Sequence, residues 1–89
     1  MEKHSHRFVE EYDGLVGFGF TREVDEYTLT YYLQKFADDQ HMAQIRPRMS
    51  DSEMEELFNL LGMLTKKYLT DEEYHKYFLK DETAIYSPT

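Results

Sequence analysis

The sequence predicts an all-α protein, a small compact bundle of three main helices with a fourth, weaker helix near the N-terminus. Two observations favour this class: apolar side chains recur at intervals of three and four residues, and two helix starts carry complete capping boxes. The main helices are expected over 22–45, 51–68 and 71–80. At 89 residues the chain is expected to form a single helical domain, with a frayed N-terminus (about 1–4) and a C-terminal tail (about 81–89).

The N-terminal helix is predicted over residues 5–16. Ser5 is a suitable N-cap, and Gly14 and Gly17 are placed to close the helix, because glycine commonly occupies the position after a helix C-terminus. The apolar residues of the segment keep helical spacing, and they are Phe8, Val9, Tyr12, Leu15 and Val16.

Residues 14–20, GLVGFGF, hold three glycines and two phenylalanines in seven positions. We interpret them as a connection whose glycines supply positive φ while Phe18 and Phe20 pack into the core. A ligand loop is the alternative. However, the glycine order matches neither the dinucleotide fingerprint nor the P-loop, and the acids at the start of the next helix would repel a phosphate. A strand over 15–20 is the third reading, and no partner strand is visible for it.

The helix over 22–45 begins after Thr21, a suitable N-cap, and ends before Pro47, because the residue preceding a proline is driven out of the α region. Two apolar stripes lie on nearly opposite sides of this helix. Such a helix is wedged between neighbours, so it is either the central helix of the monomer or a contact with another chain. One stripe carries Leu29, Tyr32, Leu33, Phe36 and Ala43, and the other carries Val24, Tyr27, Tyr31, Met42 and Ile45.

The two later helices have the most complete start signals. In each, a hydroxyl residue (Ser50 or Thr70) is followed three positions later by a glutamate (Glu53 or Glu73), which predicts a capping box. The helix over 51–68 has an apolar face of Met54, Leu57, Phe58, Leu61, Leu64 and Tyr68, and an opposite face of Glu55, Asn59, Gly62 and Lys66.

The net charge of −8 argues against direct binding to nucleic acid or to an anionic membrane. Most acids have a local explanation, because they fall in first helical turns, where they complement the helix macrodipole. These acids are Glu23, Asp25, Glu26, Asp51, Glu53, Glu55, Glu56, Asp71, Glu72 and Glu73. The alternative is an acidic nucleic-acid mimic that inhibits a DNA- or RNA-binding protein.

No catalytic, cofactor or metal-binding residue is assigned from the sequence. There is no cysteine, and no serine lies in a nucleophile-elbow pattern. The histidines form only isolated candidate ligand pairs. His4 lies two residues before His6, and two other histidines each follow an acid by three residues. A small metal-binding protein therefore stands as a further alternative. The acid–histidine pairs are Asp38 with His41 and Glu72 with His75.

The function expected from the sequence is that of a non-enzymatic cytoplasmic interaction or regulatory protein that associates with itself, as a possible homodimer, or with another protein. No cofactor, direct nucleic acid, membrane or small-molecule substrate is expected. The basic segment Arg46-Pro47-Arg48 is read as pairing locally with Asp51 or the end of the long helix, or as a docking point for an acidic partner. The candidate interaction surface consists of Val24, Tyr27, Tyr31, Met42, Ile45, Arg46 and Arg48.

Overall fold

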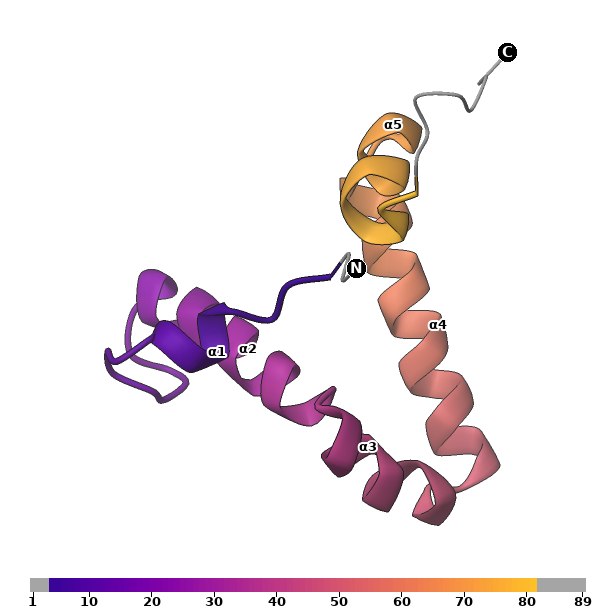
Figure 1. The fold of residues 1–89 in the computed structure, drawn as a ribbon, viewed down its shortest axis with the longest axis horizontal. Coiled ribbons are helices and arrows are strands. Elements are labelled where there is room, and N and C mark those ends of the chain that lie inside the picture. The colour runs from indigo at the N-terminus through magenta and orange to yellow at the C-terminus, as the bar shows by residue number, and fades with distance from the viewer. Residues whose placement is uncertain (1–3, 82–89) are drawn as a thin grey trace. The chain divides into compact units, whose positions relative to one another are not determined.

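The computed structural model describes residues 4–81, which form helices and their connections without any strand (Figure 1). The predicted all-α class is thereby confirmed. The described residues divide into two compact units, which we call the N-terminal unit (residues 5–48) and the C-terminal unit (residues 49–81, grouped with His4). The packing of the helices into one bundle stays a prediction.

The N-terminal unit begins with a much shorter helix than the sequence predicted. Helix α1 spans only Phe8–Glu11, and neither Ser5 nor the glycines set its ends. Arg7 occupies the N-cap position without a side-chain hydrogen bond. The backbone becomes extended at Tyr12, whose hydroxyl donates to the carbonyl of Leu15 at 2.7 Å. This bond holds a turn where the predicted helix would have continued.

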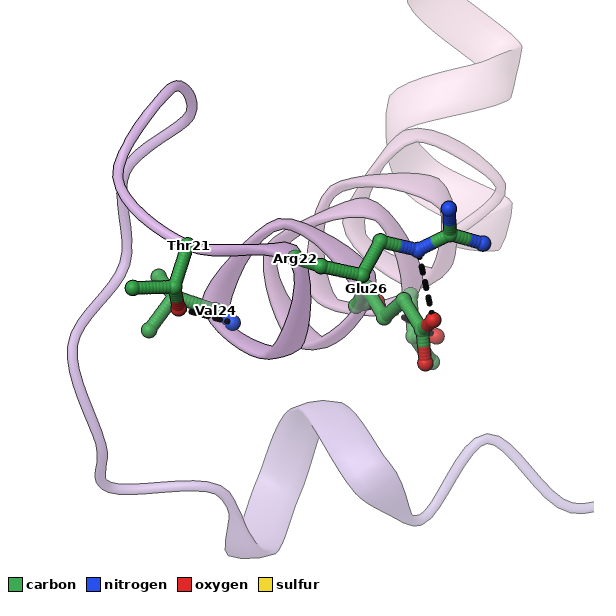
Figure 2. A network of polar contacts seen from close by, with 5 residues as sticks. Thr21, Arg22, Val24 and Glu26 are labelled. Carbon is green, nitrogen blue, oxygen red and sulfur yellow. Dashed lines mark hydrogen bonds and ion pairs between the residues drawn. The ribbon is translucent and has the colours of Figure 1, made fainter.

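Helix α2 (Arg22–Phe36) starts where the sequence predicted, after Thr21. The Thr21 hydroxyl accepts a hydrogen bond from the backbone N–H of Val24 at 3.1 Å, and the guanidinium of Arg22 contacts the carboxylate of Glu26 at 2.7 Å (Figure 2). The cap satisfies a backbone donor that has no partner within the helix. The Arg22–Glu26 pair is exposed and adds little stability.

The prediction of one continuous helix over 22–45 was wrong. The chain forms α2, then α3 (Asp39–Ile45), then the single 3-10 turn η1 (Arg46–Arg48). Asp38 causes the break, because its carboxylate accepts hydrogen bonds from the N–H groups of Gln40 and His41 and starts a new helix. Aspartate caps compete with a continuous helix in this way. The ring of His41 then contacts the carbonyl of Phe36 through Nδ1 at 2.7 Å, across the junction.

Thr28 joins α2 to the glycine-rich connection and is the one buried side chain within residues 4–81, at 4% exposed. Its hydroxyl accepts a hydrogen bond from the N–H of Gly17 at 3.0 Å and donates to the carbonyl of the same residue at 2.9 Å. The N–H of Gly19, which has φ of 98°, donates to the carboxylate of Asp25 at 2.8 Å. The connection is therefore held on the first two turns of α2 by backbone groups.

The phenylalanines of this connection do not pack into a core, which corrects the sequence-based expectation. Phe18 is 73% exposed and Phe20 is 64% exposed. The backbone bonds of Gly17 and Gly19 to α2 fix the path of the loop, and they leave both aromatic side chains on its outer surface. The interpretation of residues 14–20 as a connection is consistent with this geometry, because two of its N–H groups are bound by the chain itself.

The C-terminal unit follows the sequence-based prediction closely. Helix α4 spans Asp51–Tyr68, and α5 (Asp71–Glu73) continues into the π-helical segment η2 (Tyr74–Leu79). Both predicted capping boxes are present, with the Ser50–Glu53 and Thr70–Glu73 pairs bonding reciprocally at 2.8 to 3.1 Å. Lys80 adopts a left-handed conformation (φ 53°) and ends the segment.

Among residues 4–81, no apolar side chain is buried. A folded chain gains most of its stability by removing apolar surface from water. The apolar faces of the described helices are thus available for further contacts. No helix in the described range is long and apolar enough to cross a lipid bilayer.

Candidate interaction surfaces

The predicted interaction surface lies entirely in the N-terminal unit, but it is distributed over three elements. Val24, Tyr27 and Tyr31 belong to α2, Met42 and Ile45 to α3, and the two arginines to η1. The break at Asp38 separates the α2 residues from the α3 residues. The continuous stripe expected from a single long helix is therefore absent, although the role of these residues as a contact surface stays a prediction.

Tyr27 and Tyr31 take part in an aromatic cluster within the unit. The ring of Tyr12 lies 5.5 Å from that of Tyr27 and 6.0 Å from that of Tyr31, and it stacks on Phe8 at 4.9 Å. Aromatic pairs at these separations stabilise a fold beyond their simple burial. The cluster packs α1 on α2, so it covers part of the stripe that the sequence assigned to a partner. Tyr27 nevertheless remains 39% exposed.

The Tyr27 hydroxyl donates a hydrogen bond to the carboxylate of Glu23 at 3.1 Å, and this bond is the main reason why the pKa of Tyr27 is raised above its ordinary value of 10.0. Folding holds the phenolic proton, so the contribution of this bond to stability is present below pH 10 and is lost as the pH rises through the raised pKa. We expect Glu23→Gln to lower the pKa of Tyr27, and Glu26→Gln, the matched control, to lower it less. Titration of the Tyr27 ring carbons by NMR measures both; equal shifts would contradict the assignment.

The opposite stripe of α2 is more exposed than the predicted one. Leu29 is 54% exposed, Tyr32 is 64% exposed and Leu33 is 44% exposed. These side chains share a face at helical spacing, and each of them is exposed. The stripe of α2 that was not included in the predicted interaction surface is thus the more exposed of the two.

The basic segment is exposed at both arginines. The guanidinium of Arg48 makes a long contact of 3.4 Å with the side-chain oxygen of Gln44, one turn earlier in α3. Within the N-terminal unit, neither Arg46 nor Arg48 is paired with a carboxylate. The local pairing predicted for the basic segment is therefore represented, at the end of α3, by the contact between Arg48 and the neutral side chain of Gln44.

The C-terminal unit contains an apolar groove that the sequence did not reveal. It runs between the second half of α4 and the helical segment formed by α5 and η2, and it has a volume of about 790 Å³. We call it the α4 groove. Its lining is mostly apolar, and its principal residues are Phe58, Leu61, Gly62, Leu69, Tyr74 and Phe78.

Two residues of the α4 groove have unusual surroundings. Phe58 is 76% exposed, the highest value among the large apolar residues in the described range. Gly62, one turn later, would place a Cβ in open space with no atom within 4 Å. Helical-wheel analysis placed Gly62 on the polar face of α4. The sequence held one signal for this groove, a glycine in the middle of a predicted helix. Such a glycine destabilises the helix by about 1 kcal/mol relative to alanine and often has a packing reason.

Each histidine of the two candidate pairs has its Nδ1 atom in contact with an oxygen of the same chain. Asp38 binds the backbone N–H of His41, and the ring of His41 bonds to a carbonyl and lies against the ring of Phe36 at 5.1 Å. The Nδ1 atom of His75 contacts the carboxylate of Asp81 at 3.1 Å. Residues 4–81 contain no group of three or more histidine, cysteine or acidic side chains placed to hold a metal ion.

Several carboxylates accept hydrogen bonds from backbone N–H groups of the same chain. Glu53 and Glu73 close capping boxes, and Asp25 and Asp38 accept backbone hydrogen bonds. This use is consistent with the interpretation that the acids serve helix starts.

Comparison with protein-family models, with curated proteins and with solved structures finds no match to this chain.

Proposed function

We propose that this is a non-enzymatic cytoplasmic protein whose role is to bind other proteins, beginning with a second copy of itself. The main support is the amount of apolar surface that each unit leaves open, above all at the α4 groove. Contiguous exposed apolar surface on a small protein typically marks an interaction site. Aromatic side chains are also enriched in the centres of protein interfaces, and both Phe58 and Phe78 belong to this groove.

Light scattering coupled to size-exclusion chromatography tests this proposal. We expect the average mass to rise from that of one chain, 10.8 kDa, towards twice that value as the concentration increases from low micromolar to millimolar. High salt should weaken the complex only partly, because apolar contacts are less sensitive to salt than exposed ion pairs are. A mass that stays at one chain throughout this range would contradict self-association.

A further inference from the structure

We infer that the α4 groove receives Phe58 from a second copy of the chain, in an antiparallel pair of α4 helices related by a twofold axis. This inference rests on the proposed function and adds the partner surface, the orientation and the register. It follows from three features of α4, which are an exposed aromatic side chain, a glycine one turn away and a reversal of charge along the same face.

The first two features form a knob and a hole. Phe58 and Gly62 were assigned to opposite faces from the sequence, but they lie four residues apart and both line the α4 groove, so they share one side of α4. Phe58 is 76% exposed, and the space above Gly62 is empty. When two copies of α4 lie antiparallel about a twofold axis, Phe58 of each copy lies over Gly62 of the other. Because the same two residues meet twice, the contact is closed and self-complementary.

The far wall of the groove suits an inserted aromatic ring. Tyr74 and Phe78 line the groove from η2, and their rings are stacked with centroids 5.2 Å apart and planes inclined by 11°. A phenylalanine ring entering beside them gains contacts with aromatic groups and leaves water. The absence of a side chain at Gly62 lets the second helix approach closely on the other side.

Charge selects the antiparallel orientation. Glu55 lies three residues before Phe58, and Lys66 lies four residues after Gly62, on the same face of α4. Neither side chain forms an ion pair within residues 4–81. In the antiparallel register, Glu55 of each copy lies next to Lys66 of the other, whereas a parallel pair would place like charges together. The antiparallel arrangement also opposes the two helix macrodipoles.

A charge-exchange experiment tests the register. We expect Glu55→Lys and Lys66→Glu each to weaken homodimerisation about tenfold at low salt, because each change replaces two favourable pairs with two like-charge pairs. An equimolar mixture of the two variants should form a heterodimer of wild-type affinity, since all pairs are again of opposite sign. Glu56→Lys and Lys67→Glu are the matched controls. They make the same charge changes one residue along, which places both side chains on the side of α4 away from Phe58 and Gly62, and should leave the affinity unchanged.

The outcomes separate this inference from the proposed function. If the wild-type chain dimerises but the mixed variants do not recover its affinity, the antiparallel register is wrong while self-association stands. The same conclusion follows if the controls weaken the dimer as much as Glu55→Lys and Lys66→Glu do. If the wild-type chain never exceeds the mass of one copy, the proposed function fails and this inference fails with it. Circular dichroism of each variant checks that α4 remains helical.

Discussion

Phe58→Ala is expected to weaken self-association about a hundredfold, because each dimer loses two buried aromatic side chains at the centre of its interface. The folded monomer should change little, since Phe58 is 76% exposed and contributes little packing within its own unit. Alanine also favours helix at this position more than phenylalanine does. The concentration dependence of the mass, measured by light scattering or sedimentation equilibrium, gives the change in affinity.

Leu60→Ala is the matched control for this prediction. Leu60 is a large apolar residue of the same helix, is 47% exposed, and does not line the α4 groove. We expect its replacement to change the affinity only slightly. Equal losses for the two variants would show that general hydrophobicity of α4, and not insertion of Phe58, drives association. An unchanged affinity for Phe58→Ala would contradict the role of the groove.

Thr28→Val is expected to destabilise the N-terminal unit by about 2–3 kcal/mol, the largest loss of stability that we predict. The change keeps the shape of the side chain and removes the hydroxyl that bonds both backbone groups of Gly17. A partly buried N–H and a partly buried carbonyl would lose their partner, and the glycine-rich connection would keep only the Gly19–Asp25 bond to α2. Denaturant unfolding followed by circular dichroism measures the loss.

The same substitution two residues later provides the control. The hydroxyl of Thr30 donates to the carbonyl of Glu26 at 3.2 Å, within its own helix. That carbonyl belongs to the regular backbone pattern of α2, so Thr30→Val should change the free energy of unfolding by less than about 0.5 kcal/mol. Similar costs at both positions would indicate a general effect of valine on α2, and the special role of Thr28 would be refuted.

Helix starts could be predicted from the sequence because capping is a local property. Thr21, Ser50 and Thr70 each bond to a backbone N–H three residues on, as their spacing indicated. The break at Asp38 depends on the same chemistry, yet it lies inside a segment whose apolar spacing continues beyond it. The apolar periodicity predicted one continuous helix, whereas in the structure the Asp38 cap interrupts it.

Burial was harder to predict than helix position. The apolar patterns of the helices were read as contributing to one core, but they do not specify what covers each face. Phe18 and Phe20 were assigned to the interior, and they are exposed because backbone bonds of Gly17 and Gly19 determine the path of the loop. The α4 groove was missed for a similar reason. Gly62 contributes by lacking a side chain, and a helical wheel assigns no apolar character to an absent group.

An isotope-filtered NOE experiment on a mixture of labelled and unlabelled chains tests the central claim most directly. If Phe58 of one copy enters the α4 groove of another, its ring protons should show cross-peaks to the Hα protons of Gly62 and to the ring protons of Tyr74 in a different molecule. The account predicts these intermolecular contacts at concentrations where light scattering detects a dimer. A dimer whose intermolecular contacts all lie outside α4 and η2 would contradict it.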